Sequence, residues 1–235
     1  MPELTIDGKT VSYTLRTSRR ARRLQVRVSV EEGLVVVVPA RVSKARVQEF
    51  LDSQQAWILR HTERWERARA QRGPAVIEDG VQVRFRGEWH RVRVRQREAG
   101  RTGVAREAGE IALALAPGAE PGAVLERWMR ARAREAVLEE LARLAPEGRF
   151  PYASVALRDQ KTRWGSCSRR GNLSFNWRLI MAPPEVLRYV VAHELAHLRE
   201  LNHSPRFWRL VEGLYGDYAG PRRWLREEAA CLYGS

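Results

Sequence analysis

His193-Glu194-Leu195-Ala196-His197, followed by His203, is the stretch of this sequence that is most informative about fold and chemistry. The first two histidines are four residues apart, so on an α-helix their imidazoles lie about 40° apart, on one face. H-E-x-x-H at this spacing is typical of a site that grips one zinc ion between two imidazoles, with the glutamate as general base. The stretch therefore predicts a helix with a metal site on one face.

This helix is expected to be largely buried. Pro183-Pro184 precedes it, and proline is favoured in a first helical turn because it has no N–H to leave unpaired. Glu194 would border the histidine face, where burying a carboxylate is costly unless a positive charge lies nearby. A zinc ion would supply that charge. A second, wholly apolar face is formed by Leu187, Val191, Leu195 and Leu198.

His203 can join the same site only if the helix ends before it, because on an unbroken helix it would lie about 280° from His193. Asn202 tolerates the left-handed conformation that often ends helices. Ser204-Pro205 has the pattern of an N-cap and a first helical residue, so we expect a corner at Asn202 and a second helix from Pro205. The spacing equals that of the metzincin motif, but Glu200 replaces the glycine of that motif, so the turn must be built differently.

Three histidines leave one position open for water, as in catalytic zinc sites. Zinc lowers the pKa of such a water towards ~7, and Glu194 would take its proton during attack on a carbonyl and pass it to the leaving amine. The competing interpretations are that the histidines only pack in a core, or that the metal is purely structural. Candidates for stabilising the oxyanion are Tyr215, Tyr218 and Arg178.

The composition predicts a folded chain that does not span a membrane. It has 235 residues, of which 44% are hydrophobic and 30% charged, enough for one large domain or two small ones. The longest apolar run, Leu34 to Val38, is far shorter than the ~20 residues of a membrane span. The N-terminus has no signal pattern, and the two cysteines, Cys167 and Cys231, form no C-x-x-C motif. We therefore expect a cytoplasmic protein without a disulfide framework.

The fold class predicted from local patterns is α+β. An antiparallel, β-rich region over residues 1–117 is expected to contain one long helix from Ser43 to about Ala70, with Ser43 as N-cap. Its strands are expected over 10–15, 24–30, 34–38, 81–85, 89–94 and 111–115, with turns at Asp7-Gly8 and Glu32-Gly33. No internal repeat is evident.

A second domain is expected over residues 118–235, after the Pro- and Gly-containing linker at 117–122. It should begin with a long helix over 123–144, which is rich in Ala, Leu, Glu and Arg. A small sheet is then predicted from strands at 154–158 and 173–177, with a hairpin turn at 169–172. The motif helix follows this sheet.

The net charge of +14 favours contact with a polyanion. Charge by itself is non-specific, and a solvated surface in an arginine-rich proteome is the competing interpretation. A basic turn is expected between the strands at 10–15 and 24–30. Its possible contacts to nucleic-acid phosphates are Arg16, Arg19, Arg20, Arg22 and Arg23.

Three segments together resemble one protein family: Arg163-Trp164-Gly165-Ser166-Cys167-Ser168, then Asn172 to Leu179, then His193 to Trp208. They are similar to the bacterial YgjP-like metallopeptidases, which are grouped with M48-type peptidases and are similar to the SprT-like and WLM zincins. The resemblance is strongest over residues 150–210 and extends over most of the chain. It implies a zincin-like catalytic domain that cleaves proteins or peptides.

The resemblance also implies a Zn²⁺ ion held by His193, His197 and His203, with Glu194 as catalytic acid and base. M48 enzymes proper use a distant glutamate as third ligand, which would make Glu227 or Glu228 the candidate in place of His203. SprT-like and WLM relatives act on DNA–protein crosslinks. The alternative function is therefore a nucleic-acid-associated protease or factor acting on DNA-bound or crosslinked proteins.

The Trp164-Gly165-Ser166-Cys167 segment has two interpretations. An edge strand that binds substrate beside the motif helix is typical of zincins, and Gly165 would allow a close approach. Alternatively, Trp164 and Trp177 only pack in the core. Cys167 is expected to be a small buried residue and not a metal ligand.

Overall fold

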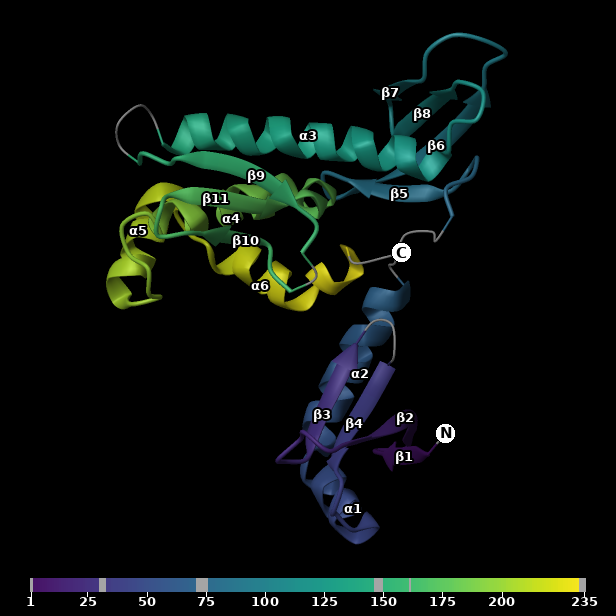
Figure 1. The fold of residues 1–235 in the computed structure, drawn as a ribbon, viewed down its shortest axis with the longest axis vertical. Helices are drawn as coiled ribbons and strands as arrows, with labels where there is room; N and C mark the ends of the chain where they lie inside the picture. The colour runs from purple at the N-terminus through teal and green to yellow at the C-terminus, as the bar shows by residue number, and fades with distance from the viewer. Residues whose placement is uncertain (1, 30–32, 71–75, 146–149, 161, 233–235) are drawn as a thin grey trace. The chain divides into compact units, whose positions relative to one another are not determined.

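The computed structural model describes residues 2–29, 33–70, 76–145, 150–160 and 162–232, and it confirms the α+β class (Figure 1). Contacts divide the chain into two compact units, Met1–Arg72 and Gly73–Ser235. The division therefore falls before the strands at 82–115 and not at residue 117, where the sequence placed it. Among the described helices, none combines the length and apolarity that a bilayer crossing requires.

The first unit is a four-stranded sheet covered by helices. The sheet has the order β1-β2-β4-β3, with β1 at Glu3–Ile6, β2 at Lys9–Ser18, β3 at Gln25–Ser29 and β4 at Gly33–Pro39. The central pair, β2 and β4, is parallel, which corrects the expectation of an antiparallel region. The core of this unit consists of Leu4, Ile6, Tyr13, Leu34, Val36, Val47, Leu51 and Ile58.

The long helix expected from Ser43 to Ala70 is two helices, α1 at Lys44–Ser53 and α2 at Gln55–Ala70. Ser43 caps α1 as predicted, because its side chain accepts from the Arg46 N–H. The break lies at Gln54, next to Ser53, whose hydroxyl donates to the Phe50 carbonyl. Of the two predicted turns, Asp7-Gly8 has positive φ at both residues, and Glu32 lies outside the described residues.

The second unit begins with another four-stranded sheet, of order β5-β6-β8-β7. Its strands are β5 at Gln82–Phe85, β6 at Glu88–Gln96, β7 at Gly103–Glu107 and β8 at Glu110–Leu115. Helix α3, Pro121–Leu144, packs on this sheet through Val124, Leu125 and Met129. Helix α3 packs on this sheet and also on the sheet that follows in the sequence. Both sheets therefore belong to the second unit.

The two four-stranded sheets have the same topology. In each, the first hairpin is antiparallel, the second strand pairs in parallel with the fourth, and a helix follows. The registers also correspond, since Tyr13 lies opposite Leu34 as Val92 lies opposite Ile111. Both first hairpins turn through a non-glycine residue and then a glycine, each with positive φ, at Asp7-Gly8 and Arg86-Gly87. The chain thus contains a repeated ββββα arrangement that the sequence analysis missed.

The motif helix packs against the third sheet, which has the order β10-β11-β9. Its strands are β9 at Ser154–Arg158, β10 at Gly165–Cys167 and β11 at Asn172–Asn176, with β9 parallel and β10 antiparallel to β11. A 3₁₀ helix, η1, spans Trp177–Met181. Helices α4 (Pro184–Ala196), α5 (Pro205–Tyr215) and α6 (Ala219–Glu227) and the short η2 (Ala229–Leu232) complete the unit.

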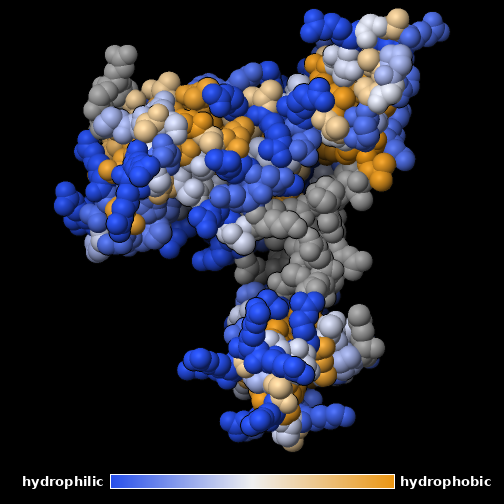
Figure 2. All heavy atoms as spheres, in the orientation of Figure 1, coloured by the Kyte–Doolittle hydropathy of each residue, from blue (hydrophilic) through white to orange (hydrophobic). Residues whose placement is uncertain are grey.

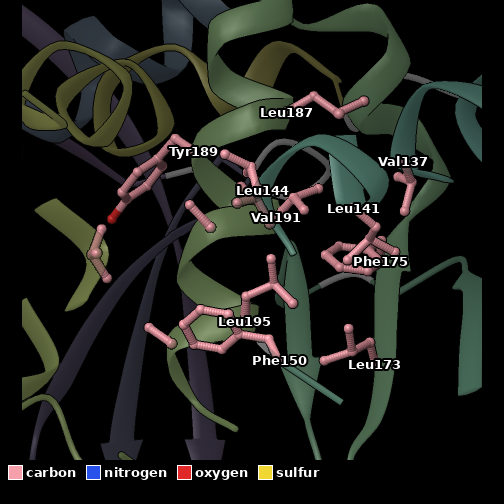
Figure 3. Close-up of a cluster of buried hydrophobic side chains, with 14 of the residues drawn as sticks. Val137, Leu141, Leu144, Phe150, Leu173, Phe175, Leu187, Tyr189, Val191 and Leu195 are labelled. Carbon is pink, nitrogen blue, oxygen red and sulfur yellow. The ribbon is translucent and has the colours of Figure 1, made fainter. Parts of the chain in front are cut away.

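Figure 3 shows the apolar core that fixes α4 in this unit. Val137 and Leu141 from α3, and Leu173 and Phe175 from β11, meet the side chains of α4. The face of α4 predicted to be apolar is confirmed, with Leu187, Val191 and Leu195 buried. One side of α4 is therefore fixed in the core, and the other is left for the histidines.

Candidate metal centre

The three histidines come together where α4 meets α5. His193 lies in the last turn of α4, and His197 directly follows the helix with helical φ and ψ. His203 lies in the corner before α5, where Ser204 accepts from the Phe207 N–H and Pro205 begins the helix, as the sequence predicts. Their nearest ligand nitrogens lie within 4.8 Å of one another.

The corner itself differs from its prediction in one respect. Asn202 does not adopt a left-handed conformation, since the described non-glycine residues with positive φ are Asp7, Arg86 and Ala108. Helix α4 instead ends at Ala196, and a turn over residues 197–199 carries the chain to Ser204, whose N–H donates to the Asn202 carbonyl at 2.8 Å. The chain therefore reaches the corner because α4 ends early, at Ala196, and not because Asn202 is left-handed.

Hydrogen bonds and ring contacts orient the imidazoles. His197 Nδ1 lies 3.0 Å from the Glu200 carbonyl oxygen. A carbonyl only accepts, so Nδ1 carries the proton and Nε2 keeps its lone pair for a metal. The Phe207 ring is fully buried beneath the cluster, with its centroid 4.5 to 4.8 Å from those of all three imidazoles.

The donor set fits zinc. His193 Nε2 and His203 Nε2 lie 3.1 Å apart. Two nitrogens bound to one tetrahedral zinc at ~2.0–2.1 Å would lie about 3.3 Å apart. Burial and the neighbouring imidazoles of His197 and His203 lower the pKa of His193 to about 3, so protons compete little for it at neutral pH. Neutral imidazoles are the form that zinc binds.

Glu194 is a buried carboxyl beside this cluster, with 5% of its surface exposed. Burial raises its pKa to about 8, and the positive charge of Arg163 opposes that rise. This pKa belongs to the metal-free site, where the carboxyl holds a proton at neutral pH. A dication held by the neighbouring histidines would lower it and favour the carboxylate, the form that accepts a proton as a general base.

Strand β10 lies against Glu194 at Gly165. A Cβ atom on Gly165 would lie 2.5 Å from Glu194 Oε1 and 2.6 Å from its Cγ, which leaves no room for a side chain. The close approach expected of Gly165 is therefore present, and it is to the Glu194 side chain. The Trp164 segment also packs on the core, so the two interpretations of this stretch are compatible.

Asn176 holds β10 in this position. Its side chain is fully buried, and Nδ2 donates to the Gln160 carbonyl at 2.7 Å. Its backbone N–H donates to the Trp164 carbonyl at 2.8 Å, and Oδ1 accepts from the Arg178 N–H at 3.0 Å. One buried amide thus connects the segment before β10 to the start of η1.

The three predicted oxyanion candidates occupy different surroundings. Arg178 forms an ion pair with Asp159 and lies over the Trp177 ring, so its charge is already balanced. Tyr215 contacts Tyr189 and Arg188 and touches none of the three histidine rings. Tyr218 stacks on Trp208, whose ring lies 5.7 Å from that of His203, so one ring separates Tyr218 from the cluster.

Two arginines near the site, Arg163 and Arg222, were not predicted from the sequence as functional residues. Arg163 lies close enough to Glu194 to influence its pKa, and Arg222 lies over the Trp208 ring. Their roles depend on β10 and α6 meeting α4, which no motif spacing indicates.

The alternative ligands do not join the cluster. The described group of donors able to hold a metal contains the three histidines and neither Glu227 nor Glu228. Glu227 forms an ion pair with Arg226. Cys167 is a free thiol in β10 whose pKa is raised to about 11 by burial and by Glu194, which disfavours the thiolate that binds metals.

The basic residues predicted to contact nucleic acid lie at the end of β2 (Arg16) and between β2 and β3 (Arg19, Arg20, Arg22 and Arg23), in the unit Met1–Arg72. Hydrophilic side chains cover much of the face of this unit seen in Figure 2. The exposed arginines around this turn are Arg16, Arg19, Arg20, Arg22 and Arg23.

Comparison with known proteins gives one family match and two partial structural likenesses. Residues 22–228 match the family model for the YgjP-like metallopeptidase domain. Among solved structures, the metallopeptidase zymogen abylysin of Pyrococcus abyssi is 23% identical, over 40% of this chain and 92% of that chain, with a TM-score of 0.33. The zymogen jannalysin of Methanocaldococcus jannaschii is 20% identical, over 40% and 91%, with a TM-score of 0.32. No curated protein matches the chain.

Proposed function

Because the chain belongs to the YgjP-like metallopeptidase family, a family of proteases, we propose that His193, His197 and His203 hold its zinc and that Glu194 is the catalytic acid and base. The observation that carries this assignment is the convergence of three imidazole nitrogens within 4.8 Å, beside a carboxyl that is 5% exposed. A purely structural zinc has no need of such a base, which argues against a non-catalytic scaffold.

Glu194 moves the proton in this proposal. Zinc, when bound, supplies a Lewis acid that polarises the substrate carbonyl and acidifies water. Glu194 accepts a proton from the attacking water as the water oxygen bonds to the carbonyl carbon and the π electron pair moves to the carbonyl oxygen. When the C–N bond breaks, Glu194 gives that proton to the leaving nitrogen.

Strand β10 is the proposed place of the substrate backbone. It is an edge strand, paired only to β11 in its sheet, and Gly165 brings it against Glu194. An extended peptide could add to this edge through main-chain hydrogen bonds. Its scissile bond would then lie near the histidines.

Metal loading tests the ligand set. Protein treated with a chelator should stop cleaving a fluorescently labelled unfolded protein, and about one equivalent of zinc should restore cleavage. His203→Ala should lose zinc, measured by atomic emission, because a ligand is removed, whereas Glu227→Gln should keep it. If His203→Ala kept zinc and Glu227→Gln lost it, Glu227 would be the third ligand.

A second candidate function is proteolysis of proteins bound or crosslinked to nucleic acid. It is supported by the exposed arginines between β2 and β3 and by the net charge of +14. Backbone contacts of this kind release counterions, so binding should weaken steeply as salt rises.

Fluorescence anisotropy with single- and double-stranded DNA tests this candidate. Replacing Arg19, Arg20, Arg22 and Arg23 by glutamine should reduce affinity and flatten the salt dependence. A matched control replaces four basic residues that are exposed elsewhere in the same unit, Arg41, Lys44, Arg46 and Arg60. Equal losses of DNA affinity in both variants would indicate attraction by overall charge without a defined binding site. Absence of DNA binding at low salt would exclude this second candidate function.

We also place the enzyme in the cytoplasm, supported by its two free thiols, Cys167 and Cys231. Cell fractionation tests this location, and recovery of the protein outside the cytoplasmic fraction would contradict it.

A further inference from the structure

A cavity of about 400 Å³ lies between α3 and one end of the sheet β5–β8. Because β6 and β8 are parallel, the hairpins β5–β6 and β7–β8 turn at the same end of this sheet. Arg86 lies in the first turn, and Arg106 in β7 lies shortly before the second turn at Ala108-Gly109. Both arginines line the cavity, whose volume is within the ~300–1,000 Å³ of small-molecule sites. None of its described lining residues belongs to the proposed metal centre.

One face of α3 forms a wall of this cavity. Trp128, Arg132 and Ala136 are spaced four residues apart, as are Glu135 and Glu139, so these side chains follow one stripe along the helix. Nη2 of Arg132 donates to Glu135 Oε1 at 2.6 Å, which balances these two charges. Nε of Arg132 is buried, and the described part of the chain gives it no acceptor. An unpaired buried donor is costly, so an acceptor on a bound ligand would stabilise this wall.

The side chain of Arg106 is held at the cavity by contacts with two strands. Alternation along β7 places Arg106 on the face of the sheet that α3 covers, opposite the buried Ile111. Its guanidinium carbon lies 5.4 Å from the centroid of the Phe85 ring, and its Nη1 lies 3.5 Å from His90 Nε2. His90 is buried, and its Nδ1 lies 3.3 Å from the Glu88 carbonyl oxygen, which only accepts. Nδ1 therefore carries the proton, and Nε2 presents its lone pair to Arg106.

Arg86 brings a second cation to the cavity in an unfavourable backbone conformation. Its φ is +53°, a left-handed value that residues other than glycine, Asn and Asp rarely adopt. Its N–H donates to Ile180 O at 2.7 Å, which fixes the turn against η1. No described carboxylate forms an ion pair with Arg86 or Arg106, in contrast to Arg132. Strained residues are concentrated at ligand sites, and these two guanidinium groups are available to a ligand.

The charges around the cavity favour an anion. Glu135 is balanced by Arg132, so two cations, Arg86 and Arg106, remain against one carboxylate, Glu139. The planar guanidinium group binds carboxylates and phosphates through paired hydrogen bonds. A volume of about 400 Å³ exceeds what inorganic phosphate fills, so the anion should carry an organic body. Hydroxyl or amino groups on that body would donate to Glu139.

We propose that this cavity is a binding site for a small organic anion, whose acid group is a phosphate monoester or a carboxylate and whose body carries hydroxyl or amino donors. Arg86 and Arg106 bind the acid group, and Glu139 accepts from the body. The inference goes beyond the proposed function and does not depend on it, because the metal centre contributes no described residue to the cavity.

Isothermal titration calorimetry of the full chain with glucose 6-phosphate, gluconate and inorganic phosphate tests the site. At least one of the two organic anions should bind more tightly than inorganic phosphate, and the tighter of the two identifies the acid group. Arg106→Gln and Arg86→Asn should each raise its Kd by about 10-fold or more, because a charge-assisted hydrogen bond is lost. Asparagine tolerates the left-handed turn, so Arg86→Asn keeps the fold. Arg91→Gln is the matched control, since Arg91 is exposed on β6 and does not line the cavity.

The indole N–H signal of Trp128 in NMR spectra gives a second readout, because Trp128 lines the cavity. This signal, assigned by its loss in Trp128→Phe, should shift when the organic anion is added. Zinc content and peptide cleavage should be equal in wild type and Arg106→Gln. Three results would each overturn the proposal: neither organic anion binds, inorganic phosphate binds as tightly as an adventitious ion, or Arg91→Gln weakens binding as much as Arg106→Gln.

Discussion

Glu194 is a buried carboxyl group that lies against the backbone of strand β10. Its neighbour on that strand is Gly165, and a Cβ atom there would lie 2.5 Å from Glu194 Oε1. The carboxyl therefore has little freedom to move away from the histidines. Position is central to general acid–base catalysis, because displacement of a reacting group by about 1 Å can cost about 10²-fold in rate.

Gly165→Ala should lower kcat by about 10²-fold while zinc content is kept, because the new methyl group would displace the Glu194 carboxyl and leave the histidines in place. Peptide-cleavage kinetics and zinc analysis check this result. Gly103→Ala is the matched control, since Gly103 also lies in a strand and a Cβ atom there would meet nothing within 4 Å. Equal activity in the two variants would contradict a role for the contact with Glu194.

The metal-free protein should lose stability as pH rises through neutrality. The folded-state pKa of Glu194 is about 8, above its ordinary value of 4.5, so between these values the folded state binds the proton more tightly than the unfolded chain. This contribution is present below about pH 4.5 and is lost as pH approaches 8. The lowered pKa of His193 acts oppositely, and its contribution is lost as pH falls from 6.5 to about 3.

Urea unfolding of metal-free wild type and Glu194→Gln separates the two effects, because only the wild type retains the carboxyl. The stability of the wild type relative to the variant should fall between pH 4.5 and 8. A difference that does not vary with pH would show that Glu194 is not buried as described.

For individual residues, the sequence predicted which side chains form the site better than it predicted their contacts. The spacing of His193, His197 and His203 predicted their convergence, since helical periodicity and the Ser204-Pro205 helix start are local properties. The approach of Gly165 to Glu194 and the placement of Arg222 depend on packing between elements far apart in sequence. The helix ended at Ala196 without a left-handed Asn202, because the turn at 197–199 was sufficient.

Between elements, the hairpin joining β5 and β6 fixes the start of α4. Its tip donates two backbone hydrogen bonds to η1, from the Arg86 N–H to Ile180 O at 2.7 Å and from the Gly87 N–H to Met181 O at 3.1 Å. Gly87 has φ of +86°, and a Cβ atom on it would lie 3.0 Å from Pro183 Cα. The hairpin thus packs against the residue that precedes the motif helix.

Gly87→Ala should destabilise the protein more than Gly109→Ala. Both glycines have positive φ at a hairpin tip, so both variants carry the left-handed cost of roughly 1–2 kcal/mol. Only Gly87 has a neighbour within 4 Å, and crowding against Pro183 should add about 1–3 kcal/mol. Urea unfolding measures the difference, and equal losses would show that the hairpin does not bear on α4.

Long, strongly patterned elements were predicted well, and short or partner-dependent ones were not. Helix α3 and the Pro184 start of α4 followed from composition and caps. Strand β7 was missed because most of Gly103–Glu107 is exposed and only weakly apolar. The parallel pairings of β2 with β4 and of β9 with β11 depend on crossover connections, which alternation of side chains does not indicate.

For the whole molecule, the metal centre belongs to one of two units with separate cores. The cluster around α4 and the cluster on β5–β8 lie in Gly73–Ser235, and the cluster on β1–β4 lies in Met1–Arg72. The repeated ββββα arrangement was hidden because corresponding strands share burial and register more than residue identity. The expected boundary at 117 failed to anticipate that β5–β8 packs on α3.

A protein lacking residues 1–72 should still bind about one zinc per chain, because every residue of the metal centre and the cores around it lies beyond that point. It should also lose any salt-sensitive DNA binding, since the arginines at 16–23 are removed. Zinc analysis and DNA titration check both results. A truncated protein that folds but binds no zinc would show that the first unit contributes to the centre.

Glu194 is proposed to perform acid–base chemistry beside a metal held by three histidines, and the Glu194→Gln protein tests this role most directly. Glutamine preserves size but cannot take a proton, so the variant should keep about one zinc per chain and lose peptide cleavage by at least about 10²-fold. Zinc content and cleavage of an unfolded protein, measured on the same preparation, would decide the matter. Full cleavage by a zinc-loaded Glu194→Gln protein would contradict this role.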